Sequence, residues 1–578
     1  MSVSRRDFLK GCVTAGGGVL LAPGLRLWAF DPEEFADPLS AYPNRDWEKI
    51  YRDQYRYDST FSWVCSPNDT HACRVNAYLR NGVITRMGEE YNYDSYSDLY
   101  GNHATPNWNP RQCAKGYTFQ RVVYGPYRIK YPIVRKGWKE WADAGFPALT
   151  TELRTKFKFD ARGQDSFEKI AWEDAFRYIA KGYVAIAKTY SGPEGAQRLL
   201  ADGYPKEMVD AMGGAGTRTC KFRGGMGLLG VIGKYGAYRL SNSMALLDVH
   251  VRGVKEEEAK AGRNWSNYTW HGDQAPGHPW VHGLQTSDCD FNDLRFSKLI
   301  IMDGKNLVEN KLTDSHWFIE CMERGAKIVV IAPEYGPPST KADYWIQIRP
   351  QTDAALFLGI TRVMIDRKWY DEEFVKSFTD FPLLVRTDTL ARLRAAEVFR
   401  NYKSDLDPEG PSRKYQGLTP EQQAKLGDFV VWDAKTNGPK AVTRDDVGGR
   451  MKARGIDPTL DGKYEVEIDG KKVEVMTLWE MYKVHLADYD LDTTSEITGS
   501  PKEQIERLAQ DIATIKPVGI HQGEGINHWF HATESNRAVY LPLMLTGNIG
   551  QPGAGAHTWA GNYKAANFQG SPWTGPGF

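Results

Sequence analysis

The segment Lys298-Leu-Ile-Ile-Met302, followed by Ser315 to Arg324 and then by Lys327-Ile-Val-Val-Ile331, decides the fold. The two apolar runs have the length of buried strands, and the stretch between them has the apolar spacing of an amphipathic helix. A strand, a helix and a second buried strand form a βαβ unit, in which the strands lie parallel. We therefore predict a mixed α/β fold built on a parallel sheet.

The rest of the chain divides into segments of different character. Residues 61–130 contain short strand-like runs separated by turn residues, and Trp172 to Tyr190 has apolar side chains at helical spacing. Residues 400–480 are charged and poorly periodic, and they end in two strand-like runs around Asp469-Gly470, which is a type I′ turn pair. We predict that they form an insertion before a last α/β portion.

The composition excludes several classes of protein. The 578 residues carry a net charge of zero, so the basic surface typical of nucleic-acid binding is missing. No apolar run of 18 residues follows the first 30, and we expect no transmembrane helix. Seven cysteines are present, but a chain of this length can stabilise itself by burial, so we expect no small disulfide scaffold.

The first residues indicate export. Ser4-Arg5-Arg6-Asp7-Phe8-Leu9-Lys10 precedes a short glycine-rich apolar stretch from Val13 to Leu25. A basic region before a short apolar region is typical of a targeting peptide, and this one is too short to span a bilayer. The paired arginines resemble the twin-arginine class of signals, which serves proteins that fold before they cross. We predict a location in the periplasm or on the outer face of the cytoplasmic membrane.

Three cysteines and one aspartate have the order of a metal site. Cys65, Asp69 and Cys73 are spaced four residues apart, and Cys113 follows after 39 further residues. Clustered ligands closed by one distant ligand are typical of iron–sulfur and zinc sites. The spacing alone leaves three interpretations open, namely an iron–sulfur cluster, a zinc site and unrelated buried cysteines.

The segment from Trp270 to Pro279 contains two histidines, one aspartate, two glycines and two prolines. Glycine and proline make such a loop rigid and irregular, and it can aim a side chain at a ligand. By itself, His271-Gly272-Asp273 is compatible with a zinc site, a general base or an ordinary polar loop.

Glycine and polar residues follow the two predicted strands. Gly304 and Asn306 form a turn after the first strand, where free backbone N–H groups can hold phosphates. Pro333 and Tyr335 follow the second strand, and Thr352-Asp353 begins a helix as a predicted cap. Each signal is weak alone, but their order is that of a dinucleotide-binding stretch.

Together these segments resemble the molybdopterin oxidoreductases of the dimethyl sulfoxide reductase family. The similarity is carried by Cys73 to Ile84, by Cys113-Ala-Lys-Gly116, by Tyr127 to Lys136 and by the strand–turn segments above. Within the family, the chain is most similar to the catalytic subunits of nitrate reductase and nitrite oxidoreductase, and to the latter above all. The resemblance implies several domains, with an N-terminal iron–sulfur domain and Rossmann-like parallel-sheet domains.

The resemblance also implies two cofactors. A [4Fe–4S] cluster would be held by Cys65, Asp69, Cys73 and Cys113, with Asp69 at the middle position where the family has cysteine. Molybdenum would be held by bis(molybdopterin guanine dinucleotide) and by Asp273, whose hard oxygen suits a high-valent metal.

Roles for single residues follow from the same resemblance. Asn68 and His528 would orient the substrate, with His531 as a second candidate, and Lys115 would couple the cluster to a pterin. The dinucleotide would contact Gly304, Asn306, Pro333, Tyr335, Thr352 and Asp353. The family usually has glycine where this chain has Gln351.

The implied reaction is oxygen-atom transfer, from nitrite to nitrate or in reverse, on a small oxyanion. Electrons would leave through the cluster to an iron–sulfur β subunit, with a haem or membrane-anchor γ subunit beyond. Alternatives in the class are reduction of nitrate, chlorate, perchlorate or selenate, and hydroxylation of a hydrocarbon. Alternatives outside it are a non-catalytic electron-transfer subunit and an exported zinc hydrolase using His271 and Asp273.

We expect five segments along the chain. Residues 1–30 form the export signal, 31–140 the iron–sulfur domain and 141–400 the molybdopterin-binding α/β domain. Residues 401–490 form the charged insertion, and 491–578 return to the active site. Catalytic subunits of this group are about twice as long by resemblance, so we expect the half that completes the second pterin site to be missing here.

Overall fold

The computed structural model describes residues 46–65, 73–90, 112–224, 231–266, 281, 291–310, 312–313, 315–406, 428–527 and 529–557. Contacts divide the chain into two compact units, one of residues 1–59 with 79–85 and one of residues 60–78 with 86–578. In the first unit, helix α2 (Asp46–Gln54) carries Asp53, whose carboxylate pairs with the Arg80 guanidinium at 2.9 Å. The predicted export signal lies outside the described residues.

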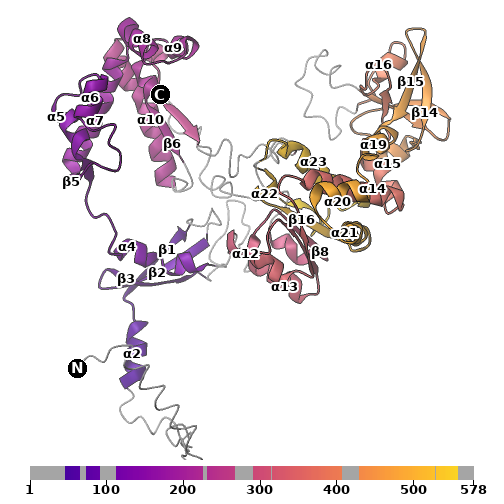
Figure 1. Ribbon diagram of the computed structural model, residues 1–578, viewed down its shortest axis with the longest axis horizontal. Coiled ribbons are helices and arrows are strands. Elements are labelled where there is room, and N and C mark those ends of the chain that lie inside the picture. The colour runs from indigo at the N-terminus through magenta and orange to yellow at the C-terminus, as the bar shows by residue number, and fades with distance from the viewer. Residues whose placement is uncertain are drawn as a thin grey trace, which may run out of the picture. The chain divides into compact units, whose positions relative to one another are not determined.

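A five-stranded parallel sheet organises the second unit (Figure 1). Its order is β10-β9-β8-β16-β17, and every neighbouring pair is parallel. The strands are β8 (Leu299–Asp303), β9 (Lys327–Ala332), β10 (Tyr344–Gln347), β16 (Val518–Gln522) and β17 (Gly555–His557). Strand β8, helix α13 (Ser315–Glu323) and strand β9 form the predicted βαβ unit, which is confirmed.

The side chains of β8 alternate between two cores. Leu299 and Ile301 lie in the larger core, on the face covered by α14 (Asp353–Asp366), α21 (Lys502–Thr514) and α23 (Ala532–Thr546). Ile300 and Met302 lie in the smaller core with α12 (Leu307–Asn310) and α13. Burial on both faces explains why the strand is an unbroken apolar run. The result is a three-layer α/β/α arrangement, and the predicted mixed α/β fold on a parallel sheet is confirmed.

Helix α14 begins at the predicted position but without the predicted cap. Thr352 precedes the helix, yet no backbone N–H of the helix donates to its side chain. Its hydroxyl instead donates to the carbonyl of Arg349 at 2.7 Å, so the cap prediction is wrong. The preceding residue, Gln351, has a φ of 73°, a left-handed value that favours glycine.

The segment containing the predicted charged insertion has a core of its own. Its elements are β11 (Leu384–Arg386), α16 (Ala395–Val398), β12 (Phe429–Asp433), β13 (Gly438–Val442), α18 (Gly449–Ala453), β14 (Lys463–Ile468) and β15 (Lys471–Thr477). Leu384, Val430 and Val475 are buried together in it. The predicted hairpin is confirmed, because Ile468 pairs with Lys471 and both Asp469 and Gly470 have positive φ.

The predicted short strands are present among residues 59–89. They form a three-stranded sheet in the order β1 (Ser59–Cys65), β2 (Cys73–Arg80) and β3 (Val83–Glu89). Helices α3 (Ala114–Tyr117) and α4 (Phe119–Tyr124) follow, and the ring of Phe119 lies 4.8 Å from that of Trp63 in β1.

A helical part follows, and it includes the helix predicted from Trp172. Its elements are β4 (Ile133–Arg135), α5 (Lys136–Asp143), α6 (Thr151–Lys156), β5 (Phe167–Lys169), α7 (Trp172–Thr189), α8 (Gly192–Ala201), α9 (Lys206–Met212), β6 (Lys221–Gly224), α10 (Val231–Arg252) and β7 (Arg263–Ser266). Trp141 and Phe146 pack edge to face at 4.9 Å in its core. The remaining helices are α15 (Glu372–Phe378), α19 (Leu478–Leu486), α20 (Leu491–Thr498) and α22 (Glu524–Asn527).

None of the helices that the structure describes is both long and apolar enough to cross a bilayer.

Replacing Gln351 by glycine is expected to stabilise the protein. A left-handed φ costs a non-glycine residue about 1–2 kcal/mol, and the greater freedom of glycine in the unfolded chain cancels part of the gain. We expect Gln351→Gly to raise the free energy of unfolding by up to about 1 kcal/mol, measured by thermal denaturation. The control Gln510→Gly, at an exposed position inside α21, should lower it by about 1 kcal/mol. Equal losses of stability in Gln351→Gly and Gln510→Gly would contradict the left-handed conformation of Gln351.

Candidate cofactor-binding site

The order of the parallel sheet creates a natural ligand site. From β8, the chain proceeds through β9 to β10 on one side, whereas β16 and β17 lie on the other side. The connections therefore diverge between β8 and β16, and α/β sheets bind ligands outside the carboxyl ends of the strands at such a point. The loops that leave these two ends begin at Gly304 and at Gly523.

Glycines allow the two loops to touch through their backbones. The N–H of Gly523 donates to the carbonyl of Asp303 at 3.0 Å, and the N–H of Gly525 donates to the carbonyl of Gly304 at 3.1 Å. A Cβ atom on Gly523 would lie 2.2 Å from the Gly304 oxygen, and one on Gly304 would lie 2.9 Å from the Cα of Gly525. No larger residue fits at this contact without moving a loop.

The turn after β8 differs from the predicted one in its hydrogen bonds. The N–H of Gly304 donates to the carbonyl of Ile331 at 3.1 Å, so the expectation of a free N–H at this residue is wrong. The side chain of Asn306 accepts from the N–H of Glu309 at 3.0 Å and donates to the carboxylate of Glu309. Asn306 therefore caps α12 and fixes the path of the loop.

A buried basic cluster, which we call the Lys305 cluster, lies at this edge of the sheet. It consists of Lys305, His521 and His557, with exposed fractions of 7%, 1% and 2%. His521 and His557 face each other across β16 and β17, with ring centroids 4.7 Å apart. A buried ammonium beside two imidazoles suits a phosphate, because lysine binds phosphate as a point charge.

Both histidines of the cluster are neutral at pH 7. Burial lowers the pKa of His557 to about 4, and the nearby Lys305 lowers it further in the same direction. Burial, His557 and Lys305 together hold the pKa of His521 well below its usual range. Neutral imidazoles can donate one hydrogen bond each, so they can orient an anion without adding charge.

Two buried carboxyls interact near the cluster, and one of them, Asp303, lies two residues before Lys305. Asp303 ends β8 and Asp353 begins α14, and each side chain influences the ionisation of the other. Burial and the charge of Asp353 raise the pKa of Asp303 well above its usual range, and burial raises the pKa of Asp353 to about 6. At neutral pH Asp303 is therefore protonated beside Asp353, where the end of β8 meets the start of α14.

The predicted dinucleotide contacts follow the carboxyl ends of neighbouring strands. Gly304 and Asn306 follow β8, Pro333 and Tyr335 follow β9, and Thr352 and Asp353 follow β10. Tyr335 is 62% exposed and packs edge to face on Trp345 at 5.4 Å, which leaves a ring face open for stacking. The structure thus brings the six residues to one edge of the sheet.

Sequence reasoning missed Lys305, His521, His557 and Asp303 as members of the site. Asp303 ends a strand that is otherwise apolar, and His521 interrupts another. A polar residue in a buried strand is the sequence feature that could have indicated a functional role for both. Gln522, fully buried opposite Asp303 in the register of β8 and β16, has the same feature.

The cysteine site is described in part. Cys65 ends β1 and Cys73 begins β2, both are buried, and Cys113 directly precedes α3. Burial raises the pKa of the Cys65 thiol to about 12, and the neighbouring Cys113 adds to the rise. A metal would reverse this effect, because a coordinated thiol is deprotonated. The donor chemistry therefore fits a metal cluster.

The remaining predicted residues are only partly placed. Lys115 lies exposed on α3, two residues beyond Cys113. Asn68, Asp69, Asp273 and His528 lie outside the described residues. His531 is exposed, and its ring packs edge to face on Phe530 at 4.7 Å. In the part of the chain that the structure describes, no group of three His, Cys, Asp or Glu forms a complete metal site.

Comparison with known proteins identifies the family. The sequence profile of the molybdopterin oxidoreductases matches residues 255–571, which include the whole parallel sheet and the Lys305 cluster. The chain belongs to the molybdopterin oxidoreductase family. The family prediction is confirmed, whereas the preference for nitrite oxidoreductase within the family stays a prediction.

Several curated relatives are similar over nearly the whole chain. The respiratory nitrate reductase subunit alpha of Haloferax mediterranei is 29% identical, with 98% of this chain and 50% of the relative covered. The perchlorate reductase subunit alpha of Dechloromonas aromatica is 28% identical, with 98% and 53% covered. The chlorate reductase subunit alpha of Ideonella dechloratans is 26% identical, with 98% and 52% covered. The chain spans about half the length of the curated relatives it matches.

Among solved structures, acetylene hydratase from Pelobacter acetylenicus is similar at 18% identity and a TM-score of 0.44, covering 85% of this chain and 44% of that one.

The acid pair predicts a pH-dependent stability. The folded-state pKa of each carboxyl lies above 3.8, so the contribution of each to stability is complete below about pH 4 and is lost as the pH rises through its folded-state pKa, which is about 6 for Asp353 and well above the usual range for Asp303. Asp303→Asn has nearly the same size and shape as the wild-type side chain but cannot ionise. We expect the loss of stability between pH 4 and pH 7 to shrink by on the order of 1–3 kcal/mol in this variant.

Thermal denaturation of the cofactor-free chain at the two pH values measures this effect. The control is Asp202→Asn, at an exposed carboxyl after α8, which should leave the pH dependence unchanged. The pairing would be contradicted if the free energy of unfolding changed by the same amount between pH 4 and pH 7 in the wild type and in Asp303→Asn.

The close backbone contact between Gly523 and Gly304 predicts that a larger residue at position 523 destabilises the protein. Gly523→Ala places a Cβ against the Gly304 carbonyl and separates the loops after β8 and β16. We expect a loss of about 1–3 kcal/mol in the free energy of unfolding, and a lower cofactor content. Gly449→Ala, whose Cβ would meet nothing within 4 Å, is the matched control. An unchanged melting temperature for Gly523→Ala would argue against the close approach.

Proposed function

We propose that this chain is the dinucleotide-binding part of a molybdenum oxidoreductase that transfers an oxygen atom to or from a small oxyanion. The observation that carries the proposal is the Lys305 cluster, a buried basic site at the diverging edge of the parallel sheet. It lies inside the range that matches the molybdopterin oxidoreductase family. The nitrate–nitrite couple is the proposed substrate pair, with nitrite oxidation as the physiological direction.

The residues at the sheet edge fit the guanine dinucleotide of the cofactor. Lys305 neutralises a phosphate, and His521 and His557 orient it through neutral imidazoles. Gly304, Gly523 and Gly525 let the backbone approach closely. Tyr335 offers a ring face to a planar base, and Asp353 offers a carboxylate at the start of α14. When bound, the molybdenum pterin supplies two-electron oxygen-atom exchange.

The other proposed roles rest on the family resemblance. Asp273 ligates molybdenum, and Asn68 and His528 orient the oxyanion. Cys65, Asp69, Cys73 and Cys113 hold a [4Fe–4S] cluster, for which the buried thiol of Cys65 beside the half-buried thiol of Cys113 is the structural support. Lys115 lies near this cluster in the sequence and couples it to the pterin.

The partners and the location belong to the same proposal. The relatives are named as alpha subunits, which supports an iron–sulfur β subunit as electron acceptor and a haem or membrane-anchor γ subunit. The twin-arginine segment supports export in the folded state.

A second candidate is reduction of perchlorate or chlorate. The 28% identity to perchlorate reductase subunit alpha is nearly equal to the 29% identity to nitrate reductase subunit alpha. Direct assay with each oxyanion therefore decides which one is the substrate.

Metal and nucleotide analysis of the purified chain tests the proposal. We expect molybdenum, about four irons per chain, and guanosine monophosphate released by acid hydrolysis. Lys305→Gln should lose most of the guanosine monophosphate and molybdenum while it keeps its iron, because the cluster ligands are remote in sequence. Lys435→Gln, in the exposed turn between β12 and β13, is the matched control.

Two results would decide against this function. Iron without molybdenum would favour an electron-transfer subunit, and zinc alone would favour a hydrolase. Turnover is then compared for nitrite with an artificial electron acceptor and for nitrate, chlorate and perchlorate with a reduced viologen. Faster turnover of perchlorate than of either nitrogen oxyanion would select the second candidate.

A further inference from the structure

A stretch of the second unit combines basic and aromatic residues in an unusual way. The 19 residues from Arg121 to Lys139 contain no acidic residue, although the whole chain has a net charge of zero. Their cations are Arg121, Arg128, Lys130, Arg135, Lys136 and Lys139. Such a local excess of one sign favours a partner of the opposite sign.

The apolar side chains of this stretch are exposed rather than buried. Tyr127 is 95% exposed, Ile129 is 66% exposed and Tyr131 is 56% exposed. Helix α7 extends the surface with Trp172 and Phe176, whose rings lie 5.7 Å apart and are 57% and 63% exposed. A continuous exposed apolar patch with a polar rim marks an interaction site, whereas single exposed residues do not.

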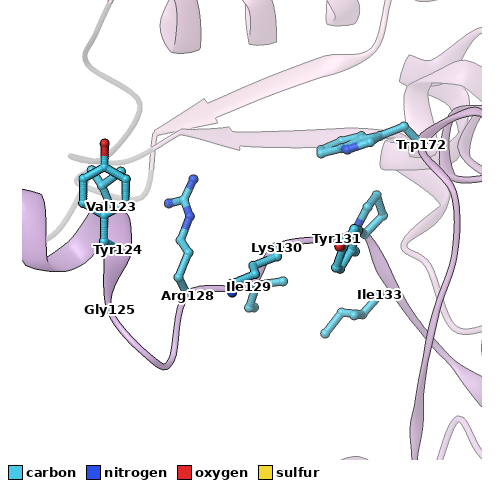
Figure 2. Close-up of a pocket in the computed structure, with 10 residues that line it drawn as sticks. Val123, Tyr124, Gly125, Arg128, Ile129, Lys130, Tyr131, Ile133 and Trp172 are labelled. Carbon is cyan, nitrogen blue, oxygen red and sulfur yellow. The ribbon is translucent and has the colours of Figure 1, made fainter. Parts of the chain in front are cut away.

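The surface is hollowed into a groove. A cavity of about 680 Å³ is lined by residues 123–125, 128–133 and 172. Figure 2 shows the guanidinium of Arg128 between the Tyr124 ring on one side and the Tyr131 and Trp172 rings on the other. The groove therefore offers aromatic walls with cationic groups between them.

The cations that line the groove differ in their ion pairing from the basic residues that follow them in the sequence. Arg135 pairs with Asp165 at 3.4 Å and Lys139 pairs with Glu168 at 3.1 Å. Within the ranges that the structure covers, neither Arg128 nor Lys130 has a carboxylate within ion-pair distance. Lys169 adds a further positive charge at 5.4 Å from the Tyr131 ring.

We propose that this groove docks a partner protein through an acidic segment that carries an aromatic or large apolar side chain. Carboxylates of the partner pair with Arg128 and Lys130, and its apolar side chain inserts between Tyr124, Tyr131 and Trp172. Tyrosine, tryptophan and arginine are the residue types that dominate binding energy at protein interfaces. Charge complementarity at the rim speeds encounter and selects the partner.

Two other occupants fit the groove less well. A small-molecule site buries 70–90% of its ligand, whereas the rings of Tyr124, Tyr131 and Trp172 belong to residues more than 50% exposed and line an open trough. A protein that binds a membrane surface does so with side chains that protrude from it. The groove is instead a hollow, which can receive a side chain that protrudes from a partner. A membrane surface is one outcome of the test below.

Fluorescence anisotropy with the full chain tests the proposal. The probe is a dye-labelled peptide with a central Phe flanked on each side by three Asp or Glu residues. The comparison peptides have Ala in place of Phe, or Lys in place of the acids. We expect saturable binding of the probe, a dissociation constant about tenfold higher with the Ala peptide, and no binding of the Lys peptide.

Variants locate the binding. Arg128→Glu combined with Lys130→Glu, and separately Trp172→Ala, should each raise the dissociation constant at least about tenfold. Lys435→Glu, an exposed charge reversal remote in sequence, should leave it unchanged. Circular dichroism shows that each variant is folded. Hydrogen exchange should show protection of residues 123–133 when the probe is bound.

Other outcomes overturn the proposal. Equal binding of the Phe and Ala peptides, or equal binding by the charge-reversed chain, would show non-specific attraction. Binding to phosphatidylglycerol vesicles that needs Trp172 and excludes the peptide would assign the groove to a membrane. A dimer in light scattering that is lost in Trp172→Ala would assign it to a second copy of the chain.

Discussion

The fold and the candidate site both depend on the backbone contact between the loops that leave β8 and β16. Two hydrogen bonds join Gly523 to Asp303 and Gly525 to Gly304, at 3.0 and 3.1 Å. The contact fixes which side chains at the carboxyl edge face one another, because β8 and β16 are paired only up to this point. Lys305, His521 and Asp303 take their places from it. The glycines are therefore a condition for the site.

The chemistry of the edge follows from burial. Removing ionisable groups from water disfavours their charged forms, so two histidines are neutral and one carboxyl of the acid pair keeps its proton. Lys305 is the group of the cluster that brings a positive charge. An anionic ligand would offset the cost of burying it. A buried cluster whose other members are neutral thus favours an anionic ligand, and the phosphate of the proposed dinucleotide is such a ligand.

Local patterns predicted the local structure well. The βαβ unit and the Asp469-Gly470 hairpin were predictable because each depends on neighbouring residues. The Thr352 cap failed because the Thr352 hydroxyl, which donates to the Arg349 carbonyl, accepts no backbone N–H of α14. The Lys305 cluster could not be predicted, since it requires β16 and β17 to pair beside β8, and these strands are far apart in the sequence. Asp69, Asp273 and His528 stay predictions.

The position of β17 has a consequence for the order of synthesis. This strand supplies His557, and it joins the sheet only through β16, so the ribosome must pass residue 557 before the edge can close. Chains are made from the N-terminus, at about 5–20 residues per second. The predicted export signal therefore precedes by many seconds the sheet edge where we propose that the phosphate binds. A nascent chain needs something to delay its transport, and an export system that accepts only folded cargo would supply that delay.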